Sequence, residues 1–284
     1  MPSVKYLVIY RHKKKYSISE MCRFFGVSRS GYYDYVNRMG VPHRHEPLAG
    51  MIRECQGRCG RTYGYRRVHL WLMREKSIYL NPKTVLGVMN KFGLLSEIRR
   101  RKKYKVMGGQ THRYANLLNR DFKADRPNAK WVTDISYIHT GEGVLYLSMI
   151  RDLFDNSIVA YRTGAEQSIN LVLNTIKDAL QKEKVAAELQ LHSDQGFQYT
   201  SRAYFSLVQQ YSITPSMSRR GNCYDNAMAE NFFSILKTEC IYRHKPKSLS
   251  EATNLIDEYI WFYNNERIQL KTMLTPLEKR RQFA

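Results

Sequence analysis

The stretch SRRGNCYDNAMAENFFSILK, residues 218–237, predicts a basic loop that leads into a helix. Asp225 is a residue type that often caps a helix N-terminus, and the aromatic and aliphatic side chains that follow it supply an apolar face. On this helix Asn226, Glu230 and Lys237 are offset by 4 and 7 residues, so they share one side. A carboxylate and an ammonium group would then project together beside the loop, although a solvated helix face has the same pattern.

The residues before this stretch predict a mixed α/β unit. Alternating apolar side chains and β-branched or aromatic composition indicate strands at 131–138, 144–150, 157–161, 189–194 and 213–217. Apolar residues at helical spacing indicate helices at 169–180 and 204–211. This order describes a mixed five-stranded sheet with helices on it. Neighbouring strands can bring Asp134 and Asp194 together, and the helix can hold Glu230 over them. Each acid alone fits a turn, cap or surface position equally well, but burying Asp134 within VTDIS is costly without a metal ion or a partner.

Charge is distributed unevenly along the 284 residues, whose net charge is +21. Residues 1–130 hold 29 Lys and Arg against 8 Asp and Glu, whereas residues 131–284 hold 17 of each. This segregation indicates a nucleic-acid-binding front joined to a part with clustered carboxylates. The sequence has neither a membrane-helix nor a signal-peptide pattern, and its five cysteines are irregularly spaced, as in reduced proteins. We therefore expect a cytoplasmic protein without a membrane partner.

Two small all-α units are predicted in the basic front. The first, at 1–40, contains a helix, a glycine turn and a Ser-capped second helix, which is the helix-turn-helix pattern. Its second helix would offer Arg29 and Tyr32 to a DNA groove or to phosphates, although short helical hairpins that bind nothing are common. The second unit, at 45–98, carries TYGYRR, and we expect its Arg66 and Arg67 to contact DNA as well.

A basic linker is predicted at 99–128. It opens with a run of cations that would track phosphates, namely Arg99, Arg100, Arg101, Lys102 and Lys103. A zinc site at residues 43–59 is poorly supported, because the candidate ligands have unsuitable spacings; they are His43, His45, Cys55 and Cys59.

Several blocks together resemble the IS-three group of bacterial insertion-sequence transposases, specifically the second-frame product. The resemblance extends over most of the chain and is carried by TYGYRR, WVTD, HSDQG, CYDNA and YNNER, and 35 residues stand between Asp194 and Glu230 as in the D,D(35)E pattern. This group belongs to the DDE superfamily with retroviral integrases. The resemblance implies a ribonuclease H-like catalytic core at 129–243 and a C-terminal helical segment at 244–284. Gln269 departs from the His of many relatives.

The resemblance also implies the chemistry. Asp134, Asp194 and Glu230 would bind Mg²⁺ or Mn²⁺, as two ions, for an in-line displacement at phosphorus. Water first cuts at the element's end, and the freed 3′-hydroxyl then attacks a second phosphodiester. The DNA-contacting residues near the site would be Lys237, Asn226, Arg219 and Arg220.

The expected partners follow from the same resemblance. They are terminal inverted-repeat DNA, target DNA, a second copy of the chain in a dimer on DNA, and a first-frame protein that is either fused or separate. The expected location is the bacterial cytoplasm, near the nucleoid. Two alternatives stay open at this point. One is a DNA-binding regulator or inactive relative without strand transfer, and the other is a ribonuclease H-like nuclease.

Overall fold

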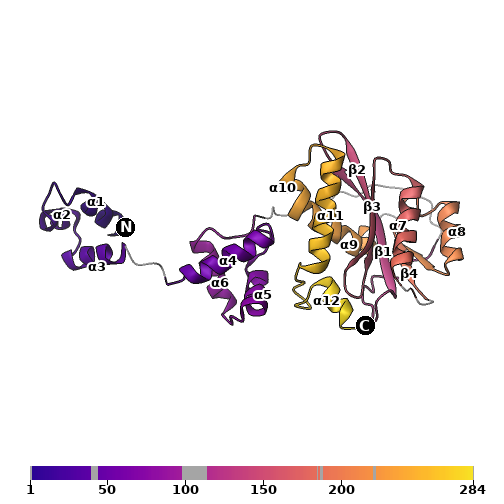
Figure 1. Cartoon of the computed structure of the whole chain (residues 1–284), viewed down its shortest axis with the longest axis horizontal. Coiled ribbons are helices and arrows are strands. Elements are labelled where there is room, and N and C mark those ends of the chain that lie inside the picture. Colours follow the sequence, from indigo (N-terminus) through magenta and orange to yellow (C-terminus); the bar gives the residue numbers. More distant parts are fainter. Residues whose placement is uncertain are drawn as a thin grey trace. The chain divides into compact units, whose positions relative to one another are not determined.

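The computed structural model describes residues 2–39, 44–97, 114–183, 185, 188–219 and 222–283. Contacts divide the chain into two units, Met1–Glu54 and Cys55–Ala284 (Figure 1). The boundary lies within helix α4 (Glu46–Arg58). Among the described residues, no helix is long and apolar enough to cross a bilayer.

The first unit begins with three helices that share one hydrophobic cluster, α1 (Pro2–His12), α2 (Ile18–Phe25) and α3 (Arg29–Met39). Gly26 ends α2 in the left-handed conformation with φ 61°, which glycine adopts without steric cost. The Ser28 hydroxyl then accepts a hydrogen bond from the backbone N–H of Gly31 at 3.0 Å. The predicted helix, glycine turn and Ser-capped second helix are therefore confirmed.

Two further helices follow, α5 (Tyr65–Lys76) and α6 (Pro82–Lys91). Pro82 stands in the first turn of α6, and the Asn81 side chain accepts a hydrogen bond from the backbone N–H of Lys83 at 2.8 Å. Val68, Leu72 and other aliphatic side chains of these helices are buried. The helices expected in this part of the chain are therefore α4, α5 and α6.

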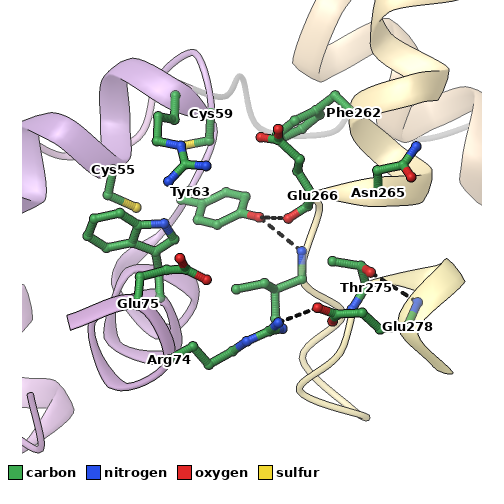
Figure 2. A pocket seen from close by; sticks show the side chains of 13 residues that line it. Cys55, Cys59, Tyr63, Arg74, Glu75, Phe262, Asn265, Glu266, Thr275 and Glu278 are labelled. Carbon is green, nitrogen blue, oxygen red and sulfur yellow. Dashed lines mark hydrogen bonds and ion pairs between the residues drawn. The ribbon is translucent and has the colours of Figure 1, made fainter. Parts of the chain in front are cut away.

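Within the second unit, this helical part contacts the C-terminal segment. The hydroxyl of Tyr63 donates to the carbonyl of Glu266 at 3.0 Å and accepts from the N–H of Ile268 at 2.9 Å (Figure 2). Arg74 forms an ion pair with Glu278, at 2.5 Å between Nη2 and Oε1. We call this set of contacts the Tyr63 contact; it joins residues about 200 positions apart in sequence.

A five-stranded mixed sheet forms the centre of the second unit. Its strands are β1 (Lys130–His139), β2 (Val144–Asp152), β3 (Ile158–Gly164), β4 (Gln190–Ser193) and β5 (Thr214–Met217). The spatial order is β3-β2-β1-β4-β5. The first three strands pair antiparallel, whereas β1, β4 and β5 run parallel. This is the mixed, ribonuclease H-like sheet that the sequence predicts.

Helices cover both faces of the sheet (Figure 1). On one face lie α7 (Ile169–Lys182) and α8 (Arg202–Gln210), and on the other α9 (Ala227–Leu236) and α11 (Leu249–Asn265). Trp131 packs in the α7 and α8 core, and its neighbour Val132 packs in the α9 and α11 core, because successive strand side chains point to opposite faces. The sheet is therefore buried on both sides.

The C-terminal segment completes this core. The C-terminal helical segment expected at 244–284 contains α11, whose Ile256 and Tyr263 pack in the same cluster as Phe232 of α9. The chain then ends in α12 (Pro276–Arg281). Arg280 of α12 forms ion pairs with Asp152, Asp155 and Glu183, which ties the last helix to the sheet.

Candidate active site

Parallel pairing of β1 and β4 sets two carboxylates at the same level. Val132 is paired with His192, an offset of 192 − 132 = 60 residues that the other pairs of this ladder share. Asp134 and Asp194 each lie two residues beyond that pair, since 194 − 134 is also 60. The predicted approach of these two acids follows from this register.

The two carboxylates also affect each other electrostatically. Burial raises the pKa of Asp134 well above its ordinary value, and the negative charges of Asp194 and Glu230 raise it further. A hydrogen bond from the backbone N–H of Ile135, 2.7 Å from Oδ1, opposes this rise. Burial likewise raises the pKa of Asp194, against a bond from the N–H of Gly196 at 2.9 Å. Three acids distant in sequence therefore lie within electrostatic reach of one another.

Helix α9 supplies the third acid and a cation. Glu230 lies in its first turn, and Lys237 stands where α9 passes into one π-helical turn, η2 (Lys237–Ile241). Burial lowers the pKa of Lys237, and the nearby charge of Asp134 opposes that shift. Both side chains thus act on Asp134, as their predicted common face requires. Single π turns of this kind are frequent at functional sites, and periodicity gives no sign of them.

Asp225 does not cap this helix, so that prediction is wrong. It lies in the 3-10 turn η1 (Cys223–Asn226), and Asn226 occupies the N-cap position without a side-chain cap bond. The fully buried carboxylate of Asp225 instead accepts bonds from Arg219 Nε at 2.9 Å and Arg120 Nε at 2.8 Å. Asn116 Nδ2 donates a further bond at 2.9 Å. The loop before α9 is therefore fixed by an internal anion.

Several predicted DNA contacts lie elsewhere than expected. Tyr32 is 2% exposed and packs in the core of the first unit, so its assignment to a DNA groove is wrong. Arg67 donates from Nε to the carbonyl of Ile268 at 2.9 Å and is occupied within the protein. Asn226 is 3% exposed, which closes it to a surface contact.

Other predicted contacts keep an open position or cannot be placed. Arg29 and Arg66 are exposed, and Arg219 is half exposed although it pairs with Asp225. The remaining predicted cations lie outside the described residues; they are Arg99, Arg100, Arg101, Lys102, Lys103 and Arg220. His43 of the zinc alternative also lies outside them.

The donor set suits a hard divalent cation, although it is not gathered into a closed cluster. Across the described ranges, no three His, Cys, Asp or Glu side chains are arranged to hold a metal ion. Carboxylate oxygens are the ligands that Mg²⁺ and Mn²⁺ prefer. Like charges repel, so a divalent cation is what would draw the three acids together.

One feature beside these acids was not predicted from the sequence. A groove of about 770 Å³ begins at Lys237 and continues between the end of β1 and the segment after α9. Its cations stand at positions 237, 245 and 247, which belong to no regular repeat, so sequence spacing gives no sign of it.

Comparison with known families places these elements. One integrase core domain family matches residues 124–223, and a second integrase core domain family matches residues 230–283. An HTH-like domain family matches residues 44–102. The integrase core family is metal-dependent, and DNA binding is common to both kinds of domain.

Relatives match nearly the whole chain. InsK of insertion sequence element IS150 from Escherichia coli strain K12 is 38% identical over 97% of this chain and 97% of its own length. The transposase InsF for insertion sequence IS3A from the same strain is 32% identical, covering 84% of each chain. The simian T-cell lymphotropic virus intasome structure matches 71% of this chain and 67% of its own, with 14% identity and a TM-score of 0.49. Because these sequence matches extend over most of the chain, the chain belongs to the IS-three group of insertion-sequence transposases, which are DDE polynucleotidyl transferases with an integrase core.

Proposed function

We propose that Asp134, Asp194 and Glu230 are the metal-binding catalytic residues of this transposase. The observation that carries the proposal is the parallel register of β1 and β4, which sets Asp134 and Asp194 at the same level of the sheet, with Glu230 close enough for its charge to raise the pKa of Asp134. Perturbed acids that face one another in this way mark functional sites more often than structural ones. Two divalent ions, either Mg²⁺ or Mn²⁺, would activate the attacking oxygen and stabilise the leaving oxygen.

The chain's own groups would hold the reacting parts in place. The N–H groups of Ile135 and Gly196 donate to one oxygen each of Asp134 and Asp194, at 2.7 and 2.9 Å, which limits the rotation of both carboxylates. Lys237 would bind a phosphate beside them, because its partly buried ammonium group is attracted by anions.

The same site would serve two reactions in sequence. Water attacks the phosphodiester at the transposon end, and the P–O bond to the 3′-oxygen breaks to leave a 3′-hydroxyl. That hydroxyl then attacks a phosphodiester of target DNA, and one P–O bond forms as another breaks. Because the phosphoryl group passes directly between oxygens, no nucleophilic side chain is required.

The proposed partners are terminal inverted-repeat DNA and target DNA, with a second copy of the chain on the DNA. The basic front would supply the general attraction, with Arg29 and Arg66 as exposed contacts. A first-frame protein, fused or separate, stays part of the proposal. The setting would be the bacterial cytoplasm, near the nucleoid.

We expect Asp134→Asn, Asp194→Asn and Glu230→Gln each to abolish cleavage and joining while end-DNA binding survives, because each removes a proposed metal ligand. Asp125→Asn is the matched control, since Asp125 is exposed and lies outside the site. Labelled end DNA with Mg²⁺ or Mn²⁺ measures both reactions. Thermal unfolding gives an independent readout, because Mn²⁺ should raise the Tm of wild type and control more than that of the three variants.

Normal turnover by any of the three variants would remove that residue from the assignment. If wild type binds end DNA but neither cuts nor joins it, the regulator alternative would take the place of the enzyme.

A further inference from the structure

A basic groove adjoins the proposed active site. It encloses about 770 Å³ and is lined by three lysines, two tyrosines and a histidine among other residues; these are Lys237, Lys245, Lys247, Tyr137, Tyr242 and His139. Within the described part of the chain, no carboxylate is among its lining residues. Three ammonium groups along one depression without a lining acid favour a polyanionic ligand.

The walls of the groove are fixed before any ligand binds. The backbone N–H of Gly141, in the turn after β1, donates to the carbonyl of Pro246 at 3.3 Å. A Cβ at Gly141 would stand 2.7 Å from the carbonyl oxygen of Lys247, so only glycine allows this approach. The Glu142 carboxylate accepts from the N–H of Leu249 at 2.9 Å, which pins the same turn to the start of α11. A preformed wall lowers the ordering cost of binding.

Aromatic rings stand open at the same groove. Tyr242 is 56% exposed and Tyr137 is 45% exposed. Tyr137 is held in place, because its hydroxyl donates to Gln167 Oε1 at 3.1 Å and its ring packs edge-on against Tyr146 at 5.3 Å between centroids. Phosphate contacts with duplex DNA need only the lysines. An open tyrosine beside them adds a surface on which an unpaired base can stack.

Lys237 links the groove to the proposed reaction centre. It lines the groove, and its charge also acts on Asp134. DNA held by Lys237 would therefore contact the groove and lie near the acids at the same time.

We propose that this groove binds unpaired, single-stranded DNA next to the reacting phosphodiester, with Lys245 and Lys247 on phosphates and Tyr242 stacked on a base. The inference rests on the proposed function and deepens it. The ligand it names is an unpaired stretch at the DNA end, since bases in a closed duplex are already stacked on each other and cannot reach a ring.

The test compares DNA ends that are fully paired with ends that carry a few unpaired nucleotides. The full chain is used with the Asp134→Asn substitution, so that binding is measured without chemistry. Affinity is followed by anisotropy, and stacking by quenching of 2-aminopurine in the unpaired strand. Tyr242→Leu should reduce the preference for unpaired ends about tenfold. Tyr242→Phe retains the ring and should retain the preference.

A second depression supplies matched controls. It is lined by Lys177 and Tyr211, and Tyr211 is 43% exposed. Tyr211→Leu and Lys177→Gln should leave both affinities within about twofold, whereas Lys245→Gln should weaken binding of unpaired ends more than of paired ends.

Two outcomes would overturn the proposal. If the groove variants lose equal affinity for paired and unpaired ends, the groove only contacts phosphates of duplex DNA. If Tyr242→Leu keeps the wild-type preference for unpaired ends, the Tyr242 ring has no role in binding. Neither outcome touches the catalytic assignment, whose failure would instead appear as cleavage by the Asp134→Asn chain.

Discussion

Asp225 fixes the loop that precedes α9. Its buried carboxylate binds Arg219, Arg120 and Asn116 at once. We expect Asp225→Asn to lower the free energy of unfolding by about 2 kcal/mol, because hydrogen bonds to a charged group are lost while the half-exposed arginines regain water. Urea unfolding of wild type and variant, with Asp125→Asn as control, measures this difference.

The same pair of proteins gives a pH prediction. Hydrogen bonds from Arg219 hold the pKa of Asp225 far below its ordinary value of 3.8. A carboxyl with a depressed pKa stabilises the fold fully above its unfolded pKa and loses that contribution as pH falls below it. The stability difference between wild type and Asp225→Asn should therefore be constant from pH 7 to 5 and shrink below about pH 4. If the stability difference already shrinks between pH 7 and 5, a titrating group other than Asp225 causes it.

Lys237 belongs to the same scale. If it binds terminal DNA beside the acids, Lys237→Ala should lower the joining rate and reduce discrimination between correct and mutated ends, and Lys237→Glu should do so more strongly by repelling phosphates. Overall affinity should fall less, because the basic front still attracts DNA. Joining rates on matched and mutated ends measure this effect. If the ratio of joining rates on matched and mutated ends is the same in wild type and both variants, Lys237 is a solvated surface lysine without a role in end recognition.

Sequence reasoning predicted that Asp134, Asp194 and Glu230 lie near one another, and the β1–β4 register and the electrostatics of Asp134 agree with this. Their catalytic role and that of Lys237 stay predictions. Sequence reasoning was wrong at Tyr32 and at Asp225 for a physical reason. Helical spacing shows which residues share a face, but the packing partner decides whether that face is buried. Tyr32 faces Ile9 and Met21, and Asp225 meets an arginine six residues before it, contacts that no local pattern contains.

At the scale of elements, the Tyr63 contact joins the second helical part to the C-terminal segment. Tyr63 is buried, and burial raises the pKa of its hydroxyl to about 12. We expect Tyr63→Phe to lower the free energy of unfolding by about 1–3 kcal/mol, because the N–H of Ile268 and the carbonyl of Glu266 lose their partner. Tyr65→Phe is the control, since that hydroxyl only accepts a bond from Arg66 at an exposed position. Chemical denaturation of both variants compares them, and equal losses would contradict the assigned role.

Strands and helices were predictable from alternation and composition, and their observed bounds agree closely with those expected. The short turns around α9 were not, because η1 and η2 depend on tertiary packing of a few residues rather than on propensity. The long-range contacts of Arg67 and Arg280 also lie beyond local reasoning.

At the scale of the whole molecule, charge governs DNA affinity. Residues 1–130 carry the entire net charge of +21. Affinity of the full chain for DNA should fall at least about a hundredfold between 50 and 200 mM salt, since several phosphate contacts release counterions. Binding titrations over this range measure the slope. A flat response would contradict the basic front as the main source of attraction.

The Tyr63 contact also has a consequence for synthesis of the chain. Its two sides are separated by 203 residues between Tyr63 and Glu266. At the usual elongation rate of 5–20 residues per second, the tyrosine would wait about 10–40 s for its partner to be made. During that interval Tyr63 and Arg74 have no C-terminal segment to contact, so this part of the second unit cannot assemble before residues 266–278 have been made. The order of synthesis therefore sets an earliest time for assembly of the second unit.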